Sequence, residues 1–142
     1  AYGSPAWTES TGGDRYRRSI YTFSKRTAPF AAFTTFDGPT GEVCLTRRSR
    51  STTPLQALTL MNDAMYVEIA RAAAESVLQE VGSGSEPEEI ANRLFRRILV
   101  RGPDPEELQS LIDFYRDHSD HPEPWMLVAR AIINTDEAIT TP

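Results

Sequence analysis

Apolar residues recur at helical spacing through most of the chain after residue 53. Side chains three or four residues apart lie on one face of an α-helix, and such a face packs into a core. The pattern predicts five helices, starting near residues 54, 63, 86, 105 and 123, with the second ending near 81 and the last near 133. In the first of these the apolar residues at helical spacing are Leu55, Leu58 and Met61. The expected inner faces of the other four helices are Tyr66, Ala70, Ala73, Val77 and Val81, then Ile90, Leu94, Phe95 and Ile98, then Leu108, Leu111, Ile112 and Tyr115, and finally Trp125, Val128, Ala129, Ile132 and Ile133.

Capping residues mark the helix starts. Three of the starts combine a capping side chain, a proline and a Glu or Gln three residues after the cap, an arrangement typical of a capping box. They are Thr53-Pro54-Leu55-Gln56, Ser85-Glu86-Pro87-Glu88 and Asp104-Pro105-Glu106-Glu107. Asp63 is the expected cap of the second helix, and Gly102-Pro103 is the expected stop of the third.

The first 53 residues carry fewer signals. Tyr16, Ile20 and Phe23 fit one face of a helix over residues 14–25, and the helix should end before Pro29. Residues 37–41 form a turn cluster, and residues 43–46 are at most a short extended piece. We therefore expect a mainly α protein, a compact bundle of about five to six helices with an irregular, aromatic-rich N-terminal arm.

Length and composition favour one folded domain over residues 1–142, with an arm at 1–53 and a helical body at 54–142. The 142 residues are 39% apolar and 25% charged, as in ordinary globular domains. No apolar run approaches the ~20 residues that span a bilayer, so membrane insertion is not expected. A single cysteine, Cys44, excludes an intramolecular disulfide and any zinc or haem site that needs two cysteines.

Charge and aromatic residues divide unevenly between the two parts. The arm holds eight Lys/Arg and four Asp/Glu, the body seven and sixteen, and eight of the thirteen aromatic residues precede residue 54. In one interpretation the arm packs over the acidic helices and its rings supply buried area. In the other, the basic residues face outward and bind an anion, because a local field can act in an acidic protein. Nucleic acid is disfavoured as a partner, since its binding domains are usually basic overall.

Two groups of cations in the arm are the candidate binding residues. They would hold a sulfate, phosphate or uronate group, with Tyr21, Phe23, Phe30 and Phe33 as stacking surfaces. The alternative is that they pair with the acidic helices or with helix C-terminal carbonyls. The candidates are Arg17, Arg18, Lys25 and Arg26, and Arg47, Arg48 and Arg50.

Candidates for chemistry are few. His118 and His121 are three residues apart and are candidate metal ligands, but the polar run around Pro122 favours a solvated loop. Cys44 is a candidate nucleophile with arginines nearby in sequence, but it has no neighbouring base. Asp37 and Glu42 flank a turn and are a candidate carboxylate pair for acid–base chemistry. No phosphate loop, nucleophile elbow or paired-cysteine motif occurs, so we expect no catalytic residues, no metal and no cofactor.

The order of several motifs resembles one family, the planctomycete-type domain of unknown function number fifteen fifty-three. The resemblance runs from about residue 15 to 142, and the chain departs from the family at Ser24 and at residues 30–33. The motifs are Arg17-Arg18-Ser19-Ile20-Tyr21-Thr22-Phe23, Lys25-Arg26-Thr27-Ala28-Pro29, Phe36-Asp37, Glu42-Val43-Cys44, Thr53-Pro54-Leu55-Gln56-Ala57-Leu58, Asn62-Asp63, Arg101-Gly102-Pro103, Pro105-Glu106-Glu107-Leu108, Ala131-Ile132-Ile133-Asn134 and Asp136-Glu137.

The resemblance implies a type of domain organisation and a cellular compartment, and no particular reaction. Proteins of this kind are typically exported and multidomain, many with a c-type haem domain elsewhere in the chain, and no catalytic residues are established for them. We therefore expect a non-catalytic structural or interaction module that docks against other domains of its parent chain, in an extracytoplasmic compartment. The alternative is a binding module for an anionic polysaccharide, and exposed arm rings beside Arg or Lys would favour it.

Overall fold

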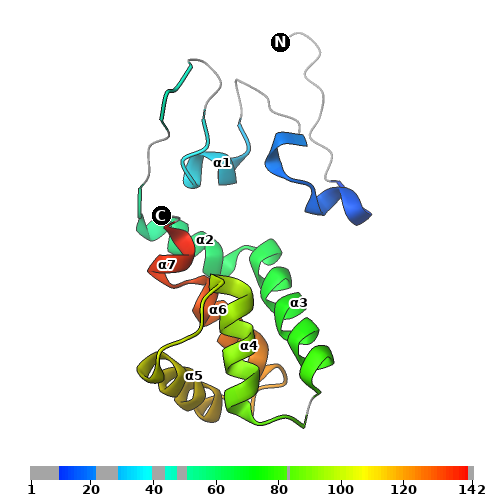
Figure 1. Ribbon diagram of the computed structural model, residues 1–142. Helices are drawn as coiled ribbons and strands as arrows, with labels where there is room; N and C mark the ends of the chain where they lie inside the picture. The colour runs from blue at the N-terminus through cyan, green and yellow to red at the C-terminus, as the bar shows by residue number, and fades with distance from the viewer. Residues whose placement is uncertain (1–9, 22–28, 40–43, 48–50, 83, 141–142) are drawn as a thin grey trace.

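The computed structural model describes residues 10–21, 29–39, 44–47, 51–82 and 84–140 (Figure 1). Within these ranges it contains helices and no strand, which confirms the mainly α fold. The elements are two 3₁₀ helices, η1 (Gly12–Tyr16) and η2 (Ser19–Tyr21), and seven α-helices, α1 (Ala31–Thr35), α2 (Pro54–Asn62), α3 (Ala64–Val81), α4 (Pro87–Leu99), α5 (Pro105–Asp117), α6 (Pro124–Ile133) and α7 (Asp136–Ile139). No helix in the described ranges is long and apolar enough to cross a membrane.

Helix α6 is the centre of the bundle. It packs against α3, α4 and α5, and α2 and α7 meet it as well. Ala70 and Ala74, one turn apart on α3, are buried and small, so α3 approaches the core closely. The ring of Tyr115 on α5 stacks on Trp125 of α6 at 4.1 Å between centroids. The buried core is Ala70, Ala74, Val77, Ile90, Ala91, Leu94, Phe95, Ile112, Trp125, Met126, Val128, Ala129 and Ile132, so the predicted inner faces of the last four helices are confirmed.

Three of the four predicted caps are confirmed. Thr53 and Asp104 form capping boxes with Gln56 and Glu107, and Asp63 accepts a hydrogen bond from the Met65 amide at 2.8 Å. Each side chain satisfies an amide that has no partner inside its helix.

The predicted cap at Ser85 is wrong. The N-cap of α4 is Glu86, whose side chain makes no capping hydrogen bond. The Ser85 hydroxyl donates instead to the Val81 carbonyl at 2.6 Å, at the end of the preceding helix. A serine between two helices can donate to a carbonyl at the end of the first helix or accept from an amide at the start of the second. Here Ser85 bonds to the end of the first helix.

Replacing Thr53 with alanine should lower the free energy of unfolding by about 1 kcal/mol, because it removes the hydroxyl that accepts the Gln56 amide. Chemical denaturation of wild type and variant measures the difference. Thr52→Ala, one residue outside the capping box, is the control and should change little. Equal stability of the Thr53 variant and wild type would contradict the role of this cap.

Helix α4 ends earlier than its sequence predicts. The expected stop was Gly102-Pro103, but the last helical residue is Leu99 and Val100 adopts a left-handed conformation with φ 63°. A valine in this region is strained, because its branched side chain approaches the following carbonyl. The early turn releases Arg101 from the helix, and Arg101 then contacts two later helices.

The predicted helix over residues 14–25 is wrong within the described residues, and its end, residues 22–25, lies outside them. Arg17 is extended, with φ −72° and ψ 147°, and separates η1 from η2. Tyr16, Ile20 and Tyr21 are exposed, so no core contact stabilises an amphipathic helix there. The short helix α1 was not predicted from the sequence.

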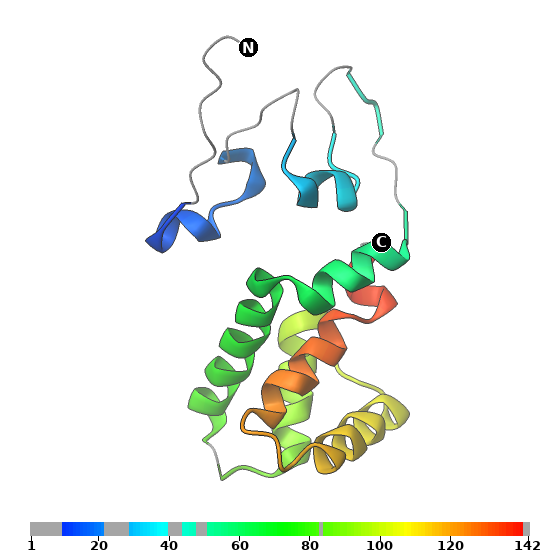
Figure 2. The same cartoon turned by 180° about the vertical axis from the view of Figure 1, so that it is seen from behind.

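The described elements of the arm, η1, η2 and α1, lie beyond one end of the bundle, where α2 and the start of α3 lie (Figures 1 and 2). Among the described residues, the Phe36 ring lies 5.9 Å from that of Tyr66, and the Tyr16 hydroxyl donates to Glu68. No described residue before Gln56 is buried. The interpretation in which arm rings supply much of the buried area is therefore wrong for the residues described.

Gln56 joins the arm to the body. It is 2% exposed, the one buried polar side chain in the described ranges. Its side-chain amide donates to the Thr35 carbonyl at 2.9 Å, and its side-chain oxygen accepts from the Thr53 amide at 3.0 Å. These bonds fix the rotation of α2 about its axis, with Gln56 and Leu60 facing inward.

Candidate functional site

The structure brings together only part of the predicted arm site. Arg17, Arg18 and Tyr21 line a shallow cavity of about 320 Å³, and Arg17 also pairs with Asp14 at 2.7 Å. Arg47 is exposed but does not line this cavity. Lys25, Arg26, Arg48 and Arg50 lie outside the described residues. Arg17, Arg18 and Arg47 make no ion pair with the acidic helices among the described residues, and the choice between pairing and anion binding stays a prediction.

Three aromatic residues of the arm, Tyr16, Tyr21 and Phe30, are exposed, and Phe33 and Phe36 are partly buried. Tyr21 is 70% exposed, and Phe30 is exposed with its ring edge-on to Phe33 at 5.6 Å between centroids. Phe23 lies outside the described residues. An exposed tyrosine beside two guanidinium groups is the arrangement expected of a stacking surface.

The two histidines make local contacts. His118 ends α5, with Nδ1 2.9 Å from the Phe114 carbonyl, and His121 Nδ1 accepts from the Glu123 amide at 3.0 Å. No group of three potential ligands capable of holding a metal ion occurs in the part of the chain that the structure describes.

The other candidate chemistry does not assemble in the described residues. Asp37 accepts hydrogen bonds from the Ser51 amide and hydroxyl at 2.7 and 2.9 Å, which ties the turn to the start of α2. Its proposed partner Glu42 lies outside the described residues. Cys44 is a free, exposed cysteine.

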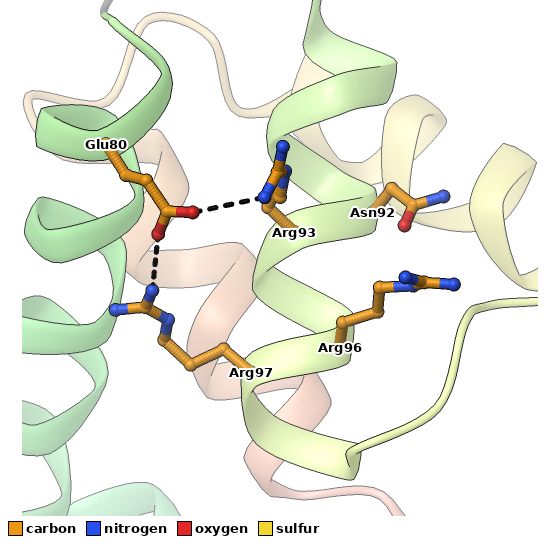
Figure 3. A pocket seen from close by; sticks show the side chains of 5 residues that line it. All are labelled: Glu80, Asn92, Arg93, Arg96 and Arg97. Atoms are coloured by element: carbon orange, nitrogen blue, oxygen red, sulfur yellow. Dashed lines mark hydrogen bonds and ion pairs between the residues drawn. The ribbon is translucent and has the colours of Figure 1, made fainter.

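A basic groove on α4 was missed by the sequence reasoning. Its cavity of about 460 Å³ is lined by five residues, one from α3 and four from α4 (Figure 3). They are Glu80, Asn92, Arg93, Arg96 and Arg97. We call this set the α4 groove.

The carboxylate of Glu80 is shared by two arginines of the groove. Arg93 donates to it at 3.1 Å and Arg97 at 2.5 Å, and Arg97 also donates to the Ser76 hydroxyl. Figure 3 shows Arg96 and Asn92 pointing away from Glu80, on the other side of α4. Within the described residues Arg96 has no acidic partner. The groove therefore holds three cations and one anion.

Helical spacing contained a signal for the groove. Asn92 and Arg96 are four residues apart, as are Arg93 and Arg97, so they form two parallel rows on α4. Because Ile90, Leu94 and Phe95 face the core, both rows face outward. The predicted binding residues rested on the excess of Lys and Arg in the arm. The body is acidic overall, so its composition does not reveal the basic face of α4.

Arg101 belongs to a structural clamp next to this groove. It donates to both carboxylate oxygens of Glu107 at 2.8 and 2.6 Å and to both of Glu137 at 2.8 and 2.6 Å. Its guanidinium also lies over the Phe95 ring, 4.9 Å from the centroid. These contacts connect the end of α4 to α5 and α7 and leave Arg101 saturated with anions.

The clamp should make stability depend on pH. The hydrogen bonds from Arg101 and from the Asp104 amide lower the pKa of Glu107 from 4.5 to about 2. A carboxyl whose pKa is lower in the folded state stabilises the fold above its unfolded pKa and loses this effect as the pH falls toward the folded value. Melting temperatures measured between pH 5 and 2 should therefore fall more steeply in wild type than in Arg101→Gln. Parallel pH profiles would contradict this role of Arg101.

An apolar face of α2 is exposed to solvent. Leu55, Leu58 and Met61 lie on the side opposite Gln56, and Leu58 is 54% exposed. The helical spacing predicted this apolar stripe, but the inward rotation of Gln56 turns it away from the core. Residues 51–62 contain no charged side chain. We call Leu55, Leu58 and Met61 the α2 stripe.

Comparison with known proteins identifies a family and no characterised relative. The sequence profile of the PSD1 family, described as a protein of unknown function (DUF1553), matches residues 2–115. No curated protein and no solved structure matches the chain significantly.

Proposed function

The chain belongs to the PSD1 family of proteins of unknown function (DUF1553), so we propose a function from the surfaces of the chain itself. We propose that it is a non-catalytic interaction module that binds its partner through the α2 stripe. The partner in this proposal is another domain of the same exported, multidomain polypeptide. The exposure of the stripe is the observation that carries the proposal, since a continuous exposed apolar face often marks a contact surface.

The physical properties of α2 support a protein contact. Covering three half-exposed apolar side chains contributes roughly 3 kcal/mol, at about 1 kcal/mol for each. No charge lies on α2, so contact there requires no desolvation of an ionised group. The stripe alone is smaller than a standard interface, so we expect further residues to contribute to the contact.

Site-specific photo-cross-linking in the full-length natural protein tests this proposal. A photoreactive phenylalanine derivative replaces Leu58, and the same derivative at the exposed Glu75 on α3 is the control. We expect a cross-link from position 58 to one defined segment of the same polypeptide, and its loss when Leu55 and Met61 are both changed to lysine. Equal cross-linking from positions 58 and 75, or none from position 58, would contradict the proposal.

A second function, binding of an anionic polysaccharide, is favoured by one observation on the arm. The exposed Tyr21 ring lies in the same shallow cavity as Arg17 and Arg18. A ring and two forked cations suit the face and the acidic group of a sugar.

Affinity measurements with a uronate polymer and a sulfated glycan test this second function. The double variant Arg17→Gln, Arg18→Gln should bind about tenfold more weakly than wild type. The variant Arg116→Gln, Arg130→Gln makes the same charge change on the body and serves as control. Equal loss in the two double variants would show general charge attraction only and would contradict an arm site.

A further inference from the structure

The α4 groove is an anomaly in the charge distribution of the body. Residues 54–142 contain sixteen acidic side chains and only seven arginines, so each cation has an ample supply of carboxylates. Outside the groove, three of the four arginines of the body, Arg71, Arg101 and Arg116, pair with carboxylates, and Arg130 donates to the Met61 carbonyl. Arg71 makes a two-pronged pair with Glu123 at 2.6 and 2.8 Å, and Arg101 binds two glutamates in the same way.

Only one carboxylate lines the groove with its three arginines. Arg93 and Arg97 both use Glu80, and Arg96 has no acidic partner among the described residues. The lining thus carries a net charge of +2, and most of its N–H donors have no protein acceptor in the described chain. The exposed side chain of Arg96 lies beside Gly102.

The end of α4 offers one explanation for these arginines, and it is insufficient. A helix C-terminus carries the equivalent of about half a negative charge, which stabilises cations in the last turn. Arg96 and Arg97 lie in that turn, but Arg93 lies a turn earlier. Half a negative charge leaves most of the +2 charge of the groove uncompensated. The remaining positive charge attracts anions.

We propose that the α4 groove binds a phosphate or sulfate group carried by a larger molecule. Forked guanidinium groups donate two parallel hydrogen bonds to such oxyanions. The two rows, Asn92 with Arg96 and Arg93 with Arg97, place donors on both sides of α4, and the volume of the cavity that they line, 460 Å³, exceeds that of one oxyanion. The groove has no residue in common with the α2 stripe, so this proposal is tested independently of the proposed function.

Titration of the intact chain with inorganic phosphate and sulfate, followed by amide chemical shifts, tests the site. Sodium chloride at matched ionic strength measures general salt effects. We expect saturable shifts confined to α4 and the end of α3 with at least one of the two oxyanions, and the ion that binds more tightly identifies the group. Shifts that match those in chloride, or that are confined to the arm, would overturn the proposal.

Two pairs of variants make the test specific. Arg96→Gln leaves both ion pairs of Glu80 intact and should weaken binding about tenfold, whereas Arg116→Gln on α5 should not. Glu80→Gln removes the competing carboxylate and should strengthen binding, whereas Glu75→Gln makes the same charge change one turn earlier and should have a smaller effect. Equal effects within either pair would overturn the proposal. Thermal melts of all four variants confirm that each is folded.

Discussion

Replacing Leu94 with alanine is expected to lower the free energy of unfolding by about 3 kcal/mol. Leu94 is 0% exposed and lies on α4, where it faces the core shared with α6. Truncation removes the transfer free energy of the lost carbons and leaves a cavity that surrounding helices fill only partly. Urea denaturation of the intact chain measures the loss.

Leu58→Ala is the matched control, because it makes the same chemical change at a side chain that is 54% exposed. Its expected effect is below about 0.5 kcal/mol, apart from the small gain in helix propensity that alanine brings. Similar losses at positions 58 and 94 would contradict the orientation of α2 and the assignment of the α2 stripe as solvent-exposed.

Replacing Gln56 with leucine is expected to lower the free energy of unfolding by about 2 kcal/mol. The change keeps the volume of the side chain but removes its bonds to the Thr53 amide and the Thr35 carbonyl. Both backbone groups then lose partners at a part-buried position, which costs more than the hydrophobic gain of leucine.

Gln79→Leu is the control for this substitution, since Gln79 is an exposed residue of α3. We expect it to change the free energy of unfolding by less than about 0.5 kcal/mol. Amide exchange should also quicken at Phe36 and Gly38 in the Gln56 variant, because the arm loses its attachment to α2. A Gln56 variant as stable as wild type would show that these hydrogen bonds contribute nothing net.

The helices of the body could be predicted from sequence because local signals and burial agree there. The caps at Thr53, Asp63 and Asp104 precede helices that the structure contains, and Val81 ends α3 as expected. Helices α3, α4, α5 and α6 also bury the faces that their periodicity marks. When capping, periodicity and packing all favour the same structure, one sequence is sufficient to locate a helix.

The arm and the rotation of α2 could not be predicted, because tertiary contacts decide them. Tyr16, Ile20 and Phe23 have helical spacing, but Tyr16 and Ile20 are exposed, and spacing without burial does not maintain a helix. On α2 the polar Gln56 takes the inner position because its partners, Thr35 and Thr53, lie there. Periodicity detects the apolar stripe but does not reveal which face has a partner.

The candidate site was predicted only in part for a similar reason. Sequence distinguishes a basic segment by its excess charge, and this drew attention to Arg17 and Arg18, which do share a cavity with Tyr21. The α4 groove depends instead on how few carboxylates reach Arg93, Arg96 and Arg97 in an acidic body. That number is a property of the packing of α3 against α4 and is not visible in composition.

Thermal unfolding of a fragment covering residues 51–142 tests most directly whether the body is complete without the arm. The fragment loses the Thr35 hydrogen bond and the Phe36–Tyr66 ring contact but no buried core residue of the described chain. We predict a monomer that unfolds cooperatively, with a melting temperature less than about 10 °C below that of the intact chain. Aggregation of the fragment or loss of cooperative unfolding would show that the arm covers part of the core, and its rings and cations would then be structural rather than free to bind a partner.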